Sequence, residues 1–117
     1  MDTGKIEDER ILKISQKVTQ AAKDTLGEKL EKVILYGSYA RGDFDVDSDV
    51  DFFVLADVPH KDTDIWWELI QERVPHISLE NDICVSIIVT ERNLFYRYSE
   101  TVPLYTNILR EGVVLYD

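Results

Sequence analysis

A short apolar run that stops at a glycine, with a second apolar run after an acidic loop, constrains the fold of this chain more than any other feature. Residues 32–36, Lys-Val-Ile-Leu-Tyr, are typical of a buried strand, and Gly37 ends that run as a turn would. Residues 49–55, Asp-Val-Asp-Phe-Phe-Val-Leu, indicate a second strand. The pattern predicts two strands joined by a tight turn, a helix start and a polar loop.

The turn at Gly37 has the properties of a phosphate-binding turn. Glycine has no Cβ, so the main chain can turn sharply and a ligand can approach it closely. We expect Ser38 to cap a helix that begins near Tyr39 and to offer its own hydroxyl. A helix start exposes unpaired N–H groups and the positive end of the helix dipole, which favour a bound phosphate.

Two aspartates at the start of the second strand form the other half of the pattern. Residues two apart on a strand point to the same face, so Asp49 and Asp51 are expected to project together. Two neighbouring carboxylates repel each other, and placing them beside an apolar run is costly unless a cation compensates. Magnesium fits this need because it prefers oxygen ligands and is commonly shared between carboxylates and substrate phosphates.

Each half of the pattern is common on its own. A Gly-Ser dipeptide after a strand is usually an ordinary turn, and an Asp-x-Asp pair is usually solvated. In this order and at this spacing, however, the two halves favour a site for a metal ion and a nucleotide.

The residues that carry this pattern resemble a known signature. Gly-Ser-Tyr-Ala-Arg-Gly-Asp at residues 37–43, followed by Ser-Asp-Val-Asp at 48–51, is similar to the motif of minimal nucleotidyltransferase domains in the DNA polymerase beta superfamily. The resemblance implies an α/β (α+β) nucleotidyltransferase fold, a mixed sheet of about four strands packed against helices. It implies transfer of a nucleoside monophosphate, usually AMP from ATP, to an acceptor hydroxyl. Gly37 and Ser38 would hold the triphosphate, and Asp49 and Asp51 would bind a pair of magnesium ions.

A third carboxylate normally completes such a site from a later strand. The candidate strand, residues 83–89, has no acid in its interior, but Asp82 lies just before it. Alternation places Asp82 on the same face as Cys84 and Ser86, so Asp82 is the expected third metal ligand and catalytic residue. Alternatively, Ser86 occupies the position where relatives carry the carboxylate, and the domain binds nucleotide and metal but transfers poorly. Glu80 is a weaker substitute because it lies outside the strand.

Three further residues of the motif have less direct roles. Arg41 is expected either to contact phosphate or to pair with Asp43 and stiffen the acidic loop, and we favour the second role. Ser48, assigned with Arg41 to nucleotide binding, is also expected to order the start of the second strand through a local bond to the main chain. The acids at 43, 45 and 47 are expected to be solvated.

Composition limits the classes of function. The 117 residues are expected to form one domain over residues 1–117, and no segment is apolar enough to span a membrane or to act as a secretory signal, so the cytoplasm is the expected location. The single cysteine, Cys84, is expected to be a small core residue. A net charge of −10 argues against direct binding of nucleic acid, which needs clustered basic residues.

The remaining segments are expected to form the scaffold. Residues 62–73 predict a helix that ends before Pro75, and His60 and His76 are expected in loops beside it. Residues 91–110 predict helix interrupted at Pro103, with a closing strand at 113–116 after Gly112. A first helix is predicted by apolar residues at helical spacing, with Gly27 as its stop. These are Ile11, Leu12, Ile14, Val18, Ala21, Ala22 and Leu26.

The resemblance also implies a partner. Domains of this kind are often encoded beside a small helical protein of the HEPN class, in some cases as an antitoxin that binds the toxin or transfers AMP to one of its tyrosines. Such a protein and a nucleoside triphosphate are the expected partners, and self-association stays open. The alternative is a module with weak or no catalytic activity that binds nucleotide and metal and acts by masking its partner.

Overall fold

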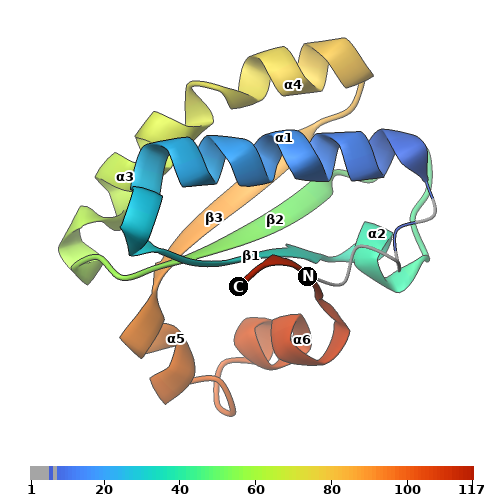
Figure 1. Cartoon of the computed structure of the whole chain (residues 1–117). Helices are drawn as coiled ribbons and strands as arrows, with labels where there is room; N and C mark the ends of the chain where they lie inside the picture. The colour runs from blue at the N-terminus through green and yellow to red at the C-terminus, as the bar shows by residue number, and fades with distance from the viewer. Residues whose placement is uncertain (1–5, 7) are drawn as a thin grey trace.

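The computed structural model describes residue 6 and residues 8–117, which form three layers with a sheet between two sets of helices (Figure 1). The strands are β1 (Leu30–Tyr36), β2 (Val50–Ala56), β3 (Val85–Glu91) and β4 (Val113–Tyr116). They lie in the order β3-β2-β1-β4, with β1 antiparallel to β2 and β4, and β2 parallel to β3. The expected mixed sheet packed against helices is confirmed.

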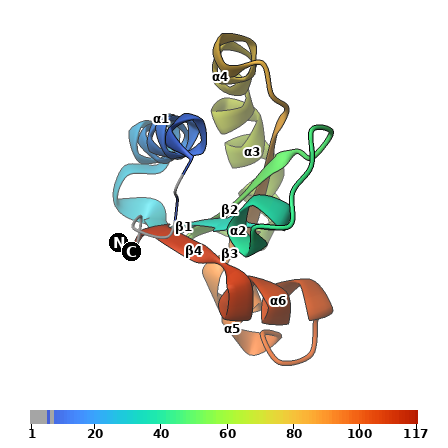
Figure 2. The same ribbon diagram turned by 90° about the vertical axis from the view of Figure 1, so that its right-hand side faces the viewer.

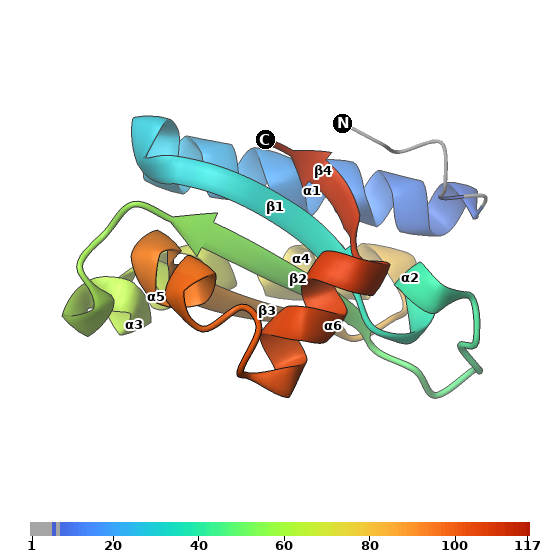
Figure 3. The same ribbon diagram turned by 90° about the horizontal axis from the view of Figure 1, so that it is seen from below.

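Helices cover both faces of the sheet, as the view from below makes clear (Figure 3). On one face lie α1 (Glu9–Leu26), α3 (Thr63–Gln71) and α4 (Val74–Asn81), and on the other lie α5 (Arg92–Arg97) and α6 (Pro103–Glu111). The short helix α2 (Ser38–Arg41) follows β1, and single 3-10 turns occur at Gly27–Lys29 and His60–Asp62. The predicted break at Pro103 and the closing strand after Gly112 are both observed.

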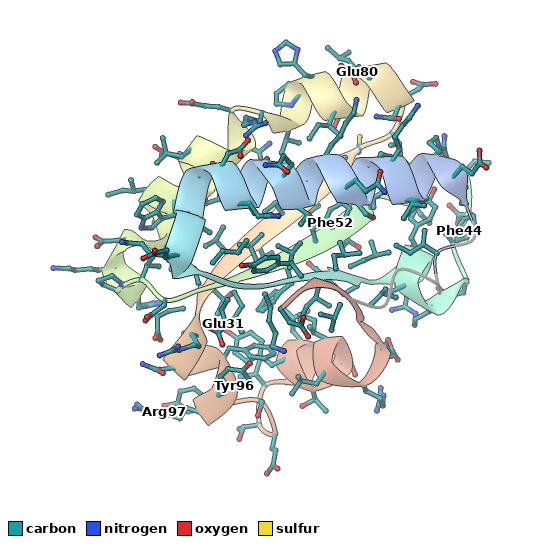
Figure 4. The ribbon with its side chains drawn as sticks, in the orientation of Figure 1. Glu31, Phe44, Phe52, Glu80, Tyr96 and Arg97 are labelled. Atoms are coloured by element: carbon teal, nitrogen blue, oxygen red, sulfur yellow. The ribbon has the colours of Figure 1, made fainter. Side chains whose placement is uncertain are left out.

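Strand β2 is buried on both faces because one helical layer packs against each face of the sheet there. Phe52 packs in the cluster beneath α1 (Figure 4). Phe53 packs with Phe95 and Ile108 in the cluster beneath α5 and α6. Each fully buried phenylalanine stabilises the fold by roughly 1.5–3 kcal/mol. The strand that carries Asp51, directly after Asp49, is therefore held in place by core packing on both faces.

Helix α1 begins and ends as its sequence predicts. The Asp8 carboxylate accepts hydrogen bonds from the main-chain N–H groups of Arg10 and Ile11, and the helix ends at Gly27, whose φ is +56°. All of the predicted apolar residues except Leu12 are buried against the sheet. The helix therefore covers one face of the sheet, as expected.

The helix predicted at residues 62–73 is observed as α3, but the helix that follows it was not predicted. Helix α3 ends at Gln71, and a separate helix, α4, then runs from Val74 to Asn81 with Pro75 in its first turn. Proline is tolerated there because the first N–H groups of a helix have no intrahelical partner. His76 therefore lies in a helix, and His60 lies in a 3-10 turn, rather than both lying in loops.

The third strand is displaced from its predicted bounds, residues 83–89, to Val85–Glu91. Asp82 ends α4 with a left-handed main chain, φ +49°, so the chain leaves the helix through a turn before the strand begins. Pairing with β2 begins where the N–H of Val50 donates to the carbonyl of Cys84.

Within the described part of the chain, no helix is both long and apolar enough to cross a membrane.

Candidate active site

One edge of the sheet gathers the motif residues. The carboxyl end of β1 and the amino ends of β2 and β3 meet there, beside α2 and the loop that follows it (Figure 2). The register places Tyr36, Asp51 and Ser86 in one row across β1, β2 and β3. Because side chains alternate along a strand, Asp51 lies on the face that also carries Phe53, beneath α5 and α6.

Asp51 is held in a partly apolar setting. Its side chain is half-buried, whereas Asp49 is exposed just before the strand. Burial is the main cause that raises the pKa of Asp51, the negative charge of Asp49 raises it further, and the positive charge of Arg41 lowers it. The influence of Asp49 on Asp51 agrees with the expected pair of neighbouring carboxylates.

Gly37 lies so close to Asp51 that an added side chain would force the Asp51 carboxylate to shift. Its φ of +79° and ψ of −157° lie in a region that only glycine adopts readily. A Cβ added at Gly37 would lie 2.4 Å from Oδ2 of Asp51. The main chain of the turn therefore lies directly against the carboxylate, which the sequence did not predict.

Tyr36 is a site residue that the sequence analysis missed. It lies next to Asp51 in the register and packs edge-on against Phe53, with 6.3 Å between ring centroids. Burial first, and then the negative charge of Asp51, raise the pKa of the Tyr36 hydroxyl to about 12. The phenol therefore stays protonated at neutral pH beside the carboxylate. Its position at the end of the first strand could have indicated this contact, because Asp51 lies near the start of the adjacent antiparallel strand.

The prediction that Ser38 caps α2 is wrong by one residue. The cap position is Gly37, and Ser38 is the first residue of the helix, with no side-chain cap bond at this end. The carbonyl of Ser38 accepts hydrogen bonds from the N–H groups of Gly42 and Asp43, which closes this short turn. The Ser38 hydroxyl therefore does not serve the end of the helix.

The acidic loop is ordered by local contacts. Nε of Arg41 lies 3.1 Å from a carboxylate oxygen of Asp43, and its Nη1 lies 3.5 Å from Glu111. This ion pair corresponds to the stiffening role that we favoured for Arg41. Ser48 accepts a hydrogen bond from the main-chain N–H of Asp45 at 3.0 Å, which is the local bond expected of it. The acids at 43, 45 and 47 are exposed, as expected.

Asp82 lines the same cavity as Asp49 and is not in the row of Asp51. Asp49, Asp82 and Cys84 line the same open cavity of about 430 Å³, whereas Asp51 and Ser86 do not. Cys84 is exposed there, so its prediction as a core residue is wrong, because the turn at Asp82 places it before the buried part of β3. In the register, Ser86 is the residue next to Asp51.

No three acidic, histidine or cysteine side chains are gathered as a metal-binding group within residue 6 and residues 8–117. The carboxylates of Asp49 and Asp51 nevertheless fit magnesium, which takes one or two protein carboxylates and completes its shell with water and phosphate oxygens. A cation would also relieve the repulsion that raises the pKa of Asp51. The role of Asp82 as a third ligand stays a prediction.

The sequence matches the family described as "Nucleotidyltransferase domain" over residues 13–113. Two proteins of Methanocaldococcus jannaschii are similar along most of their length. The one named "Putative protein adenylyltransferase MJ0141" is 34% identical over 95 residues, 81% of this chain and 94% of that protein. The one named "Putative protein adenylyltransferase MJ0604" is 29% identical over 104 residues, 89% of this chain and 96% of that protein.

Solved structures share the fold. A structure described as a toxin-antitoxin with AMP-PNP has a TM-score of 0.58 and 23% identity over 87% of this chain and 72% of that chain. A mutant of the toxin-antitoxin MntA-HpeT has a TM-score of 0.54 and 25% identity over 86% of this chain and 70% of that chain. The mixed sheet and its helical layers are therefore an arrangement that these proteins have in common.

Proposed function

Because this chain belongs to the nucleotidyltransferase domain family, we propose that it transfers AMP from ATP to a hydroxyl group on a partner protein. The observation that carries this proposal is the close contact of the Gly37 turn with Asp51, beside Asp49, at one edge of the sheet. A phosphate-sized turn and a pair of carboxylates meet there, as nucleotidyl transfer requires. The names of the two archaeal relatives support a protein as the acceptor.

Each residue of the site has a proposed task. Gly37 leaves the main chain open to the triphosphate, and Ser38 offers a free hydroxyl beside it. Asp49 and Asp51 would hold magnesium, which when bound neutralises triphosphate charge and lowers the pKa of an acceptor hydroxyl. Arg41 and Ser48 act through the loop, because their observed contacts are with Asp43, Glu111 and Asp45.

The chemistry is a single displacement. The acceptor oxygen forms a bond to the α-phosphorus, the bond between that phosphorus and pyrophosphate breaks, and the proton of the hydroxyl leaves to a base. Asp82 is the proposed base because it lines the same cavity as Asp49. The tasks of the carboxylates are therefore to hold the nucleotide in place and to favour loss of the acceptor proton.

The proposed partner is a small helical protein of the HEPN class, with this chain as its antitoxin. Toxin-antitoxin structures share the fold, and the net charge of −10 disfavours nucleic acid as the acceptor. Partner proteins with a basic surface would in contrast be attracted to the acidic loop.

A second function is favoured by one observation. Ser86 lies beside Asp51 in the register, on the later strand from which the family resemblance implies a third carboxylate. If Asp82 does not replace that carboxylate, the domain binds nucleotide and metal and acts by masking its partner.

Intact-mass analysis separates the two functions. The protein and the product of the gene adjacent to its own are incubated with ATP and magnesium. Transfer adds the mass of one adenylyl group to the partner, and this addition disappears in the Asp49→Ala/Asp51→Ala variant. A stable complex whose partner keeps its original mass would instead establish the masking function.

A further inference from the structure

The cavity beside Asp49 is built from three segments that are distant in the sequence. We name it the α4 cleft, and its volume is about 430 Å³. The acidic loop, the last turn of α4 and the chain leading into β3 form its walls, at the edge of the sheet seen in Figure 2. Its lining residues are Val46, Asp47, Ser48, Asp49, Ser78, Leu79, Asp82, Ile83 and Cys84.

Two apolar side chains of the α4 cleft are unusually exposed. Val46 is 98% exposed and Leu79 is 81% exposed. Among the exposed large apolar residues in the described part of the chain, these two are the most exposed. Other apolar residues of α4, Val74 and Ile77, are buried in the core. Val46 and Leu79 therefore present apolar surface to water at the mouth of the cleft, which favours contact with another molecule.

The charges of the cleft select its occupant. Asp47, Asp49 and Asp82 line it, and none of its lining residues is basic. The Gly37 turn, which is proposed to hold the triphosphate, is not among the lining residues, and carboxylates without a bound cation repel phosphate. A segment that carries Lys or Arg is attracted here instead.

We infer that the α4 cleft docks the acceptor segment of the partner protein, an inference that rests on the proposed function. The segment has a basic character, an apolar side chain that packs between Val46 and Leu79, and a hydroxyl-bearing residue. Asp49 belongs both to the cleft and to the carboxylate pair, so a hydroxyl held in the cleft lies beside the metal-binding carboxylates. The cleft thereby determines which hydroxyl receives the nucleotide.

The single cysteine of the chain reports directly on occupancy. Cys84 is exposed and lines the α4 cleft, so a docked segment shields its thiol from an alkylating reagent. The probe is a short synthetic peptide with one tyrosine, one leucine and several arginines, and its counterpart has glutamate in place of every arginine. We expect the basic peptide to slow the alkylation of Cys84 in the absence of nucleotide, and the acidic peptide to leave the rate unchanged.

Two variants test the apolar contact. Leu79→Ser and Val46→Ser should weaken the protection of Cys84 and lower transfer to the basic peptide by at least about tenfold, the effect typical of an anchoring residue. Ile65→Ser is the matched control, because Ile65 is also an exposed aliphatic residue, 58%, but lies on α3 outside the cleft. Thermal unfolding verifies that all three variants stay folded.

The outcomes separate this inference from the proposed function. Equal alkylation with both peptides, or transfer at wild-type rates by Leu79→Ser and Val46→Ser, would overturn the docking site. Protection of Cys84 by the basic peptide without any transfer of AMP would establish docking and contradict the proposed enzymatic activity. Equal losses in the Ile65→Ser control would also overturn the assignment, because the effect would not depend on the cleft.

Discussion

Asp51 is the residue on which the geometry of the site depends. It lies against the main chain of Gly37, between Tyr36 and Ser86 in the register, and its pKa is raised by burial and by Asp49. These contacts make the negative charge of Asp51 unfavourable in the free protein. A bound cation would stabilise that charge. The residue is therefore tuned for binding rather than for the stability of the free chain.

The titration of Asp51 predicts how stability depends on pH. Below the usual pKa of aspartate, the folded and unfolded chains both carry the proton, and Asp51 costs nothing. As the pH rises through the raised folded pKa, the carboxylate becomes charged in an unfavourable setting and stability falls. Asp51→Asn removes this titration, so in EDTA at pH 7 its Tm should equal or exceed that of the wild type, with the difference closing in acid.

Magnesium and ATP should reverse that order, because a ligand that binds the folded state raises its Tm. The wild type should gain stability, and Asp51→Asn should not. Mutating a residue that only hydrogen-bonds to a metal ligand typically lowers metal affinity about 10- to 100-fold. Losing a ligand itself should lower it at least as much. Equal stabilisation of both proteins by magnesium and ATP would remove Asp51 from the metal site.

Gly37 is predicted to be intolerant of any side chain. Gly37→Ala introduces strain at φ +79° and a clash with Asp51, whereas Gly42→Ala introduces strain alone, since nothing lies within 4 Å of the added Cβ. Gly42→Ala should cost about 1–2 kcal/mol, and Gly37→Ala should cost more. Chemical denaturation measures both. In the Asp51→Ala background the excess cost should shrink, and an unchanged excess would mean that the clash does not exist.

The identity of the third carboxylate is open to a direct test. Asp82→Asn keeps a residue that tolerates the left-handed conformation at φ +49° and removes only the charge. It should lower turnover by about 10²–10⁴-fold, the usual contribution of a general base, while nucleotide binding persists. Ser86→Asp restores a carboxylate beside Asp51. A rise in turnover from Ser86→Asp together with wild-type rates for Asp82→Asn would assign the missing acid to position 86.

At the scale of elements, a side-chain hydrogen bond from α3 reaches β3, one of the two edge strands of the sheet. Strand β3 has a neighbour on one side only, and Nε1 of Trp67 in α3 donates a 2.8 Å hydrogen bond to the carbonyl of Ile87. An uncovered edge strand can pair with other chains. The indole therefore links α3 to the sheet and covers part of this edge.

Trp67→Phe tests the value of that link. The variant keeps an aromatic ring and loses the donor, so the free energy of unfolding should fall by about 0.5–1.5 kcal/mol, measured by urea denaturation. Trp66→Phe is the comparison, because Trp66 packs against the core cluster instead. An unchanged free energy of unfolding in Trp67→Phe would contradict the role of this hydrogen bond.

Elements with strong periodic or glycine signals could be predicted from the sequence. The first helix, the strands around Gly37 and the closing strand follow from local patterns. Helix α4 could not be predicted, because Pro75 is compatible both with the end of one helix and with the first turn of the next. The exposure of Cys84 depends on the left-handed turn at Asp82, and an aspartate adopts that conformation too rarely for its sequence to predict it.

For the site too, contacts within one contiguous motif could be predicted, whereas contacts between distant segments could not. Asp49, Asp51 and Gly37 lie in one contiguous motif, so their proximity could be predicted. The α4 cleft joins the acidic loop to α4 and to β3 across the fold, and the positions of Val46 and Leu79 depend on that packing. No local pattern reports such contacts.

At the scale of the whole molecule, the buried core and the motif residues lie in different parts of the fold. Two helical layers bury the central strand, and the motif residues lie at one edge of the sheet where three strand ends meet. The acidic surface, with its net charge of −10, then favours a basic partner over nucleic acid. The central claim is that this edge transfers a nucleoside monophosphate.

The most direct test follows the two ends of ATP. The protein, its partner and magnesium are incubated with ATP labelled either at the α-phosphorus or at the γ-phosphorus. We predict that the α-label becomes covalently attached to the partner and that the γ-label is released in pyrophosphate, with both products lost in Asp49→Ala/Asp51→Ala. Attachment of the γ-label to the partner, or undiminished α-label transfer by the double variant, would contradict the claim.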